Sequence, residues 1–287
     1  MIRLFAVPFL ILGLVLGTKP QARAAEAAVS GEETRRQVNL AGRQRMLSQQ
    51  IVLMLCMARQ GVKPEETTAA ARTAISEFDT VLRGLRFGDP ALGLPMEARR
   101  EVLDRLARVE DIWPRFRGMA QAAADAGAPL DALRGMAPQI LGAMNDAVQV
   151  IAAMGHSEGS KELLHTVDIA GRQRMLLVRG AMEVCLATLA IDRVEDEQRA
   201  AKTRGLFEVS MRKLREGDEA EGIVPPPMWE IDAMLELVEK DWGELKVVVE
   251  EILSGGNSSV DALDRLLLLT TRTLNNMNEA VWIYESI

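Results

Sequence analysis

The sequence predicts an all-α protein made of two tandem antiparallel four-helix bundle units related by internal duplication. Three observations predict this fold class. Aromatic residues make up only 4% of the 287 residues, whereas Ala, Leu, Met, Glu and Arg are plentiful, a bias that favours helices over strands. The run AGRQRML occurs at 41–47 and again at 170–176. Turns rich in Gly and Pro divide each half of the chain into four long segments, and short connections favour up-and-down bundles.

Each expected helix ends at a cluster of Gly, Pro or Ser. In the first half we expect helices at 32–60, 65–87, 97–126 and 130–154, with Pro114 and Pro138 inside the last two. In the second half we expect helices at 161–191, 195–216, 229–253 and 260–285. The expected units span 25–156 and 157–287.

The duplication extends well beyond the AGRQRML run. At a constant offset of 129 residues, Phe78 matches Phe207 and Trp113 matches Trp242. The same offset relates Arg86 to Arg215, Gly88 to Gly217, Asp89 to Asp218 and Gly93 to Gly222. Later in each half the offset becomes 133, as between Met144 and Met277, which fits a longer turn before the last helix. Each repeat therefore contains about four helices.

Residues 1–24 have the pattern of a secretory signal peptide. Arg3 precedes a short apolar run at 4–16, and Ala22-Arg23-Ala24 fits the cleavage rule, so we expect the cut after Ala24. An uncleaved N-terminal anchor is the alternative. The later sequence contains no apolar run long enough to span a membrane, so we expect a mature protein in an exported compartment.

The chain is acidic, with a net charge of −7 that becomes −10 once the three basic residues of the leader are removed. Such a protein has no general attraction for nucleic acid or anionic lipid. An anion would need a local positive site.

Cys56 and Cys185 are the only cysteines, and they lie at the same position of the repeat. An exported compartment permits a disulfide, although we favour two small buried apolar residues.

The first helix is expected to have a face of small and polar side chains that meets another helix. On a helical wheel this face collects Val38, Ala41, Gly42, Arg45, Ser48, Gln49, Val52 and Cys56. The opposite side carries Leu40, Leu47, Ile51, Met54 and Ala58 and should fill the core of its own bundle. Because Gly inside a helix costs roughly 1 kcal/mol against Ala, Gly42 indicates a close approach.

Arg45 lies at the centre of this face, and Arg174 is its repeat counterpart. A buried guanidinium needs an anionic partner, and a carboxylate from another helix would serve. If the two repeated helices pair about a pseudo-twofold axis, however, the two guanidinium groups converge, and a small planar oxyanion between them would relieve their repulsion. Gly42 and Gly171 would allow this approach. Whether the repeats pair within one chain or between the chains of a homodimer stays open.

Other polar residues of the repeat are expected around the arginines. Ser48 and Gln49 could add donors, but Leu177 and Val178 replace them in the second copy, so the site would be lopsided. Arg43 and Arg172 lie about 160° away on the wheel, so they should lie outside the seam and either snorkel to solvent or pair with acids. Asn145 and its counterpart Asn278 could form hydrogen bonds across the bundle core.

The run Asn39-Leu40-Ala41-Gly42-Arg43-Gln44-Arg45-Met46-Leu47-Ser48-Gln49 resembles the signature of the PilJ-type sensor domain, the N-terminal domain of type IV pili methyl-accepting chemotaxis transducers. It is also similar to the P-box of nitrate/nitrite sensor kinases. The resemblance implies a periplasmic four-helix bundle that binds nitrate or nitrite at a two-fold interface, with Arg45, Gly42, Arg174 and Gly171 as ligand residues. Both copies lie in one chain here, and the usual transmembrane, HAMP and signalling modules are absent from the sequence. The protein would therefore report to a membrane partner such as a sensor kinase or chemoreceptor.

Two other classes of function compete with anion sensing. The first is a structural or interaction bundle without a small ligand. The second is an enzyme, but the sequence has no HExxH, CxxC or phosphate-binding loop, and its two histidines, His156 and His165, are isolated. The methionines follow apolar helical spacing, so they predict core rather than a metal site. We therefore expect neither catalysis nor a cofactor nor a metal.

Overall fold

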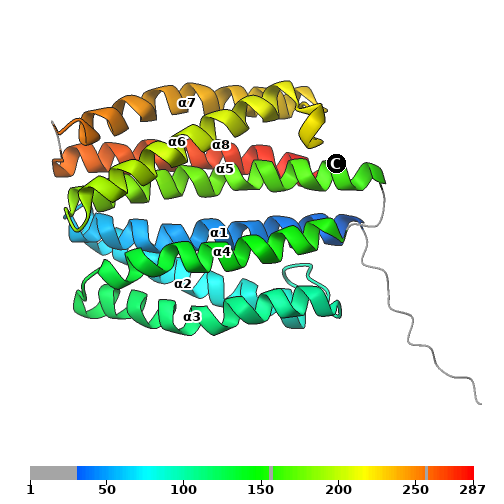
Figure 1. Ribbon diagram of the computed structural model, residues 1–287, viewed down its shortest axis with the longest axis horizontal. Helices are drawn as coiled ribbons and strands as arrows, with labels where there is room; N and C mark the ends of the chain where they lie inside the picture. Colours follow the sequence, from blue (N-terminus) through cyan, green and yellow to red (C-terminus); the bar gives the residue numbers. More distant parts are fainter. Residues whose placement is uncertain (1–30, 155–157, 256–257) are drawn as a thin grey trace, which may run out of the picture.

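The computed structural model describes residues 31–154, 158–255 and 258–287, and these residues form helices that run along one long axis (Figure 1). The helices are α1 (Gly31–Arg59), α2 (Pro64–Phe87), α3 (Arg100–Ala126), α4 (Asp131–Ala153), α5 (Glu158–Thr188), α6 (Arg193–Glu216), the short 3-10 helix η1 (Glu219–Glu221), α7 (Trp229–Leu253) and α8 (Val260–Ser286). The α-helices pack as two groups of four, α1–α4 and α5–α8, so the predicted fold class is confirmed. The expected signal peptide and His156 lie outside the described residues.

Local chemistry explains where the helix ends differ from those expected. The third helix begins at Arg100 rather than Glu97, because the Glu97 carboxylate accepts hydrogen bonds from the backbone N–H groups of Ala98 and Arg99. Free N–H groups at a helix start need such an acceptor. The fifth helix ends at Thr188 rather than Ile191, and Ala190 soon afterwards has a positive φ of 55°. Helices α3 and α4 continue through Pro114 and Pro138.

The two groups repeat each other in detail. Gly88 and Gly217, which end α2 and α6, have φ values of 79° and 80°. Each is followed by an isolated β-bridge, Asp89 with Leu94 and Asp218 with Ile223. The matched aromatic pairs also recur, with ring centroids 3.9 Å apart for Phe78 and Trp113 and 4.5 Å apart for Phe207 and Trp242.

Helices α1 and α5 lie side by side at the centre and join the two groups (Figure 1). Helix α1 also packs against α2 and α4, so it is covered on most sides. Leu47 and Ile51 are buried in the core as expected, whereas Leu40 and Met54 are only partly buried at its edge. The small face of α1 is the one that meets the other repeat.

Cys56 of α1 and Cys185 of α5 form a disulfide, with Cα atoms 6.2 Å apart. The interpretation that we favoured, two free buried residues, is therefore wrong. Two helices related by a local twofold axis can bring matched positions together at that axis. One cysteine in each repeat is therefore enough to form a disulfide between them. The disulfide indicates an extracytoplasmic location, since reducing compartments keep thiols free. Within the described ranges, no helix combines the length and apolar character of a membrane span.

Candidate functional site

The structure brings Arg45 and Arg174 together between α1 and α5. A Cβ atom added to Gly42 would lie 3.2 Å from Nη2 of Arg45 and 3.9 Å from Nη2 of Arg174. A Cβ atom added to Gly171 would lie 3.3 Å from Nη2 of Arg174 and 3.7 Å from Nη2 of Arg45. The two repeats therefore pair within one chain, and both guanidinium groups lie beside both glycines.

The glycines make room for side chains rather than for a neighbouring backbone. In both cases the atoms nearest to the added Cβ belong to guanidinium groups. This differs from the backbone approach that the sequence suggested. A methyl group at either position would press on the end of an arginine, so the missing side chains shape the space around the charges.

Arg45 is fully buried and has a complete set of partners. Its Nη2 forms an ion pair of 2.7 Å with Oδ1 of Asp168, from the second repeat. Its Nη1 donates to Oδ1 of Asn145 at 3.1 Å, and its Nε approaches the Gly42 carbonyl at 3.5 Å. A carboxylate from another helix, the alternative partner considered above, is thus present for Arg45.

Arg174 is 3% exposed and has no carboxylate in direct contact among the described residues. Its Nη2 donates to Oδ1 of Asn39 at 2.7 Å, and its buried Nε has no hydrogen-bond partner within the described part of the chain. Burial, together with the positive charges of Arg45 and Arg43, lowers the pKa of Arg174 to about 9. Its guanidinium is charged at neutral pH, and the charge of Glu285 offsets this lowering only in part, without a direct contact.

Asn39 and Asp168 occupy the same position of the repeat, which explains this asymmetry. In the first copy the residue is neutral and faces Arg174, whereas in the second copy it is acidic and faces Arg45. The carboxylate whose charge acts on Arg174 is that of Glu285, and it accepts a hydrogen bond from the Asn39 amide rather than from Arg174. We did not identify Asn39 and Asp168 from the sequence, although this replacement inside VNLAGRQRML and VDIAGRQRML was the available signal.

Ser48 and Gln49 are buried beside Arg45, but their donors serve the backbone. The Ser48 hydroxyl donates to the Arg45 carbonyl at 2.9 Å, and the Gln49 amide donates to the Ala137 carbonyl of α4 at 3.3 Å. The Ser48 hydroxyl thus bonds within α1, and the Gln49 amide, which also donates to the Ser48 hydroxyl at 3.0 Å, links this turn of α1 to α4. Leu177 and Val178, their counterparts, are buried apolar residues.

The flanking arginines pair with acids as expected, but one of them also reaches the seam. Arg43 forms an ion pair of 2.7 Å with Glu77. Arg172 lies 3.1 Å from Oδ2 of Asp168, so it shares its acid with Arg45. The expectation that Arg172 stays away from the seam is wrong, because a long side chain can bend along the helix to a residue one turn earlier.

The other asparagines and the motif glutamines complete the surroundings. Asn145 contacts Arg45 instead of crossing the bundle core, whereas Asn278 is half-buried. Gln44 and Gln173, at matched positions of the motif, are fully buried. Both amide atoms of Gln44 and Oε1 of Gln173 have no hydrogen-bond partner within the described residues. The repeated motif thus contains polar side chains that the sequence analysis overlooked.

A surface groove along α4 and α5 borders this site. It is lined by Pro138, Leu141, Gly142, Asn145, Gln149, Arg172, Met175 and Arg179. Asn145 lies in the groove and contacts Arg45, and Arg172 lies in the groove and contacts Asp168. No cluster of potential metal ligands occurs among the described residues.

Comparison with known protein families agrees with this geometry. The family model PilJ, described as type IV pili methyl-accepting chemotaxis transducer N-term, matches residues 29–136 and 157–266. No curated protein matches the chain in sequence. Each matched segment includes one AGRQRML run, the first three α-helices of its group and the beginning of the fourth, α4 or α8. The chain therefore belongs to the PilJ family of sensory, non-catalytic domains and carries two copies of its domain.

Proposed function

We propose that this protein is a periplasmic sensory module that binds a small oxyanion, nitrate or nitrite, between α1 and α5 and reports to a membrane partner such as a sensor kinase or chemoreceptor. Arg174 and Arg45 are the anion-binding residues, with Gly42 and Gly171 leaving the space around their guanidinium groups. Ser48 and Gln49 support the site through the backbone of Arg45.

The observation that carries this proposal is the unneutralised charge of Arg174. A buried guanidinium without a counter-ion is costly, and its lowered pKa reflects that cost. An anion that accepts hydrogen bonds from Nε and Nη2 would offset it through charge-assisted bonds. The planar donor fork of arginine fits the planar oxygens of nitrate or nitrite.

The charge balance favours an anion with a single charge. The buried groups Arg45, Arg174 and Asp168 sum to one positive charge. A divalent anion would leave excess negative charge in an apolar interior, where uncompensated charge is disfavoured. The groove that contains Arg172 and Asn145 offers a route by which the anion reaches the site.

The same site would transmit binding as a change between the two units. The disulfide fixes α1 to α5 at Cys56 and Cys185, eleven residues beyond Arg45 and Arg174, or roughly 16 Å along a helix. Motion caused by an anion would therefore be largest at the opposite ends of α1 and α5. Those ends include the start of α1, which follows the expected signal or anchor segment.

The competing function is a structural or interaction bundle in which the motif only packs helices. The ion pair between Arg45 and Asp168 favours that alternative for one half of the site. It does not account for Arg174, whose matched partner is neutral.

Calorimetry with nitrate and with nitrite tests the proposal, in protein prepared free of both anions. We expect saturable binding of one anion per chain in the wild type, and loss of this binding in Arg174→Gln. Arg86→Gln, which breaks a surface ion pair with Glu110, is the matched control and should bind normally. Absence of heat and of thermal stabilisation in the wild type would leave only the structural alternative.

A further inference from the structure

A stripe of exposed apolar side chains runs along α7 and α8 of the second unit. On α7, Trp229, Leu237 and Val247 are 76%, 44% and 52% exposed. Their spacing in the sequence places them on one side of the helix. On α8, Leu268 and Trp282 are both 64% exposed, and their spacing also places them on one side. We call these five residues the apolar stripe.

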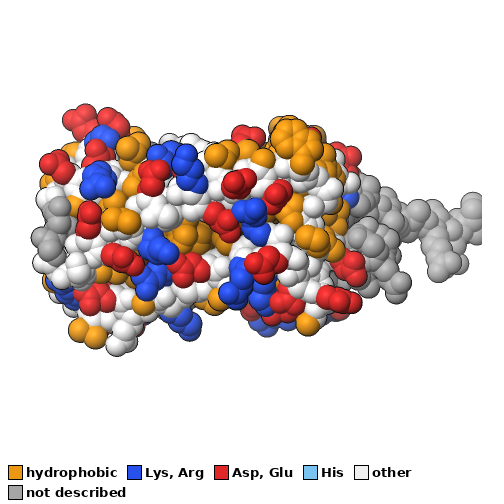
Figure 2. Space-filling model, turned by 90° about the horizontal axis from the view of Figure 1, so that it is seen from above, with side chains coloured by type: hydrophobic (Ala, Val, Ile, Leu, Met, Phe, Trp, Pro, Cys, Tyr) orange, Lys and Arg blue, Asp and Glu red, His pale blue; other side chains and the backbone are white. Residues whose placement is uncertain are grey.

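Ion pairs between the two antiparallel helices fix the register of the stripe. Arg272 of α8 lies 2.7 Å from Glu244 of α7, and Arg265 lies 3.4 Å from Glu251. In this register both tryptophans of the stripe lie near one end of the helix pair, where α7 begins and α8 ends. Figure 2 shows apolar side chains gathered toward this end, on the right, and mixed with charged ones elsewhere. The stripe extends for roughly 27 Å along α7, a length that suits a partner helix of about five turns.

The first unit has the same fold but lacks the stripe. Its residues at the matched positions are all exposed, and they are Arg100, Arg108, Gly118, Gly135 and Gln149. Single exposed apolar residues are ordinary in soluble proteins, but here the two copies differ at every position of the stripe. The fold of the unit therefore does not require these apolar side chains. An exposed apolar surface with no role in folding indicates an interaction site.

Carboxylates that lack a cationic partner border the stripe. Glu236 on α7 and Glu279 on α8 are exposed, and neither forms an ion pair with the described residues. Glu230 also forms none there, and its Oε2 is buried without a hydrogen-bond donor in that part of the chain. Lys240, one turn after Glu236, adds a single positive charge. The border is therefore acidic, and it favours a partner that carries Lys or Arg.

The charge of this border also distinguishes between the occupants that an apolar surface can have. A second copy of the chain, bound through the same stripe, would form an isologous interface, and the acidic border would then face itself. An anionic membrane surface would be repelled by the same carboxylates. A basic amphipathic helix offers an apolar side for the stripe and positive charges for its border.

We propose that α7 and α8 form the docking surface for a basic amphipathic helix of a partner protein. The partner helix packs lengthwise along the apolar stripe, with Trp229 and Trp282 as anchors at one end. Its Lys or Arg side chains lie beside Glu236 and Glu279. This surface gives the reporting step of the proposed function a location, but it does not depend on anion binding between α1 and α5.

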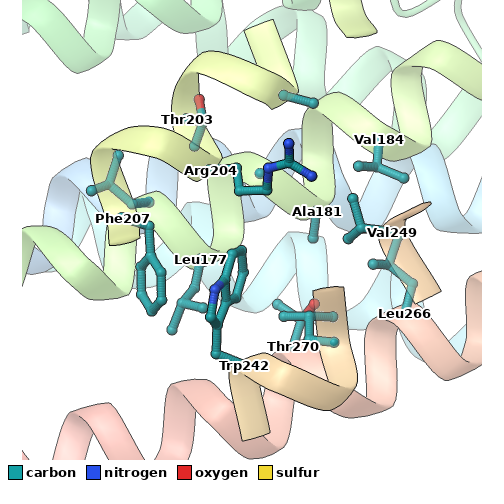
Figure 3. A pocket seen from close by; sticks show the side chains of 14 residues that line it. Leu177, Ala181, Val184, Thr203, Arg204, Phe207, Trp242, Val249, Leu266 and Thr270 are labelled. Carbon is teal, nitrogen blue, oxygen red and sulfur yellow. The ribbon is translucent and has the colours of Figure 1, made fainter. Parts of the chain in front are cut away.

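Fluorine NMR of the full chain labelled with 5-fluorotryptophan tests the proposal, because the four tryptophans include two inside the stripe and two outside it. Trp113 is buried in the first unit. Trp242 points inward beside a small cavity of the second unit, close to Phe207 (Figure 3). The probe is an amphipathic helical peptide of Leu and Lys, about 18 residues long. We expect it to shift the Trp229 and Trp282 signals saturably and to leave the other two unchanged.

Two control peptides test the chemistry of the partner. A peptide with Glu in place of Lys keeps the apolar side but has the opposite charge, and a peptide with the same composition but evenly scattered Leu has no apolar side. Both should bind at least about tenfold more weakly. Equal binding of either control would overturn the proposal. Shifts of the stripe tryptophans caused by protein concentration alone, or by vesicles of phosphatidylglycerol, would overturn it in favour of a second copy or of a membrane.

Matched variants locate the surface. Leu237→Gln removes one apolar side chain of the stripe and should weaken binding of the Leu and Lys peptide about tenfold. Leu206→Gln is the control, because Leu206 on α6 is likewise 45% exposed and replaces Glu77 of the first unit, but lies outside the stripe. The double variant Glu236→Gln with Glu279→Gln should weaken binding and reduce its dependence on salt.

Absence of peptide binding, an unchanged affinity in Leu237→Gln, or an equal loss in Leu206→Gln would each overturn the proposal. These experiments contain no nitrate, so their outcome is separate from that of the calorimetry on the arginine site.

Discussion

The residues at the matched positions 39 and 168 determine whether each guanidinium group of the arginine site contacts a carboxylate. Substituting either residue should therefore change both the stability of the protein and its affinity for nitrate. Asn39→Asp gives Arg174 the same partner that Arg45 has in Asp168, where the contact is 2.7 Å. A hydrogen bond to a charged group contributes about 1.5–3 kcal/mol. We therefore expect Asn39→Asp to raise the free energy of unfolding by about 1–3 kcal/mol. Because the new carboxylate competes with the anion, nitrate affinity should fall about ten- to a hundredfold.

The new carboxylate would also face Glu285, whose Oε2 accepts from the Asn39 amide. Glu285 lies 3.7 Å from Arg36, so it has another cation to pair with. The double variant Asn39→Asp with Glu285→Gln removes the remaining repulsion and should show the larger gain in stability. Chemical denaturation measures the stability, and calorimetry measures nitrate binding.

Asp168→Asn is the matched control in the opposite direction. It leaves both guanidinium groups without a counter-ion and should lower the free energy of unfolding by about 3–5 kcal/mol. Added nitrate should restore part of that loss and bind at least as tightly as in the wild type. An Asn39→Asp protein that binds nitrate as the wild type does, or a folded Asp168→Asn protein that no longer binds it, would refute the reasoning.

Three further predictions concern pH and stability. Nitrate affinity should fall as pH rises above about 9, because Arg174 then loses its proton. Stability without nitrate should rise as pH increases above about 9, because the unfolded chain then binds more protons than the folded one. Titrations at several pH values measure both effects, and an affinity that does not change up to pH 11 would contradict the first. Reducing the disulfide, or replacing both cysteines by Ala, should lower the free energy of unfolding by about 3–5 kcal/mol for a loop of this length. Chemical denaturation with and without reductant measures this change, and an unchanged denaturation midpoint would contradict the prediction. Burial raises the pKa of Glu183 despite its ion pair with Arg179, so its ionised form is less stable in the folded protein than in water. Glu183→Met, the residue of the first unit, should stabilise the protein by about 1–2 kcal/mol at pH 7 and by less as pH falls through the raised pKa; a loss of stability at pH 7 would be the opposite result.

The sequence was sufficient to predict the fold because the repeat constrained it twice. Each helix could be checked against its counterpart, 129 residues later for the first three helices and 133 later within the last. Gly88 and Gly217 also end their helices with nearly the same φ. The convergence of Arg45 and Arg174 also followed from the repeat, since matched positions near a local twofold axis meet.

The partners of those arginines were harder to predict. Asp168 lies six residues before Arg174 in sequence, yet it pairs with Arg45 of the other repeat. This pairing between repeats depends on how α1 and α5 cross. A helical wheel of one helix gives no information about that crossing. The disulfide was missed for a related reason, because a single cysteine per repeat forms a bond only if both lie close to the axis.

The most direct test of the central claim is a structure of the protein crystallised with nitrate. The account predicts one nitrate between α1 and α5, within hydrogen-bond distance of the Arg174 guanidinium and next to that of Arg45, with the ion pair between Arg45 and Asp168 retained. A nitrate-saturated crystal in which Arg174 still binds only Asn39 and no anion lies between the two arginines would contradict it.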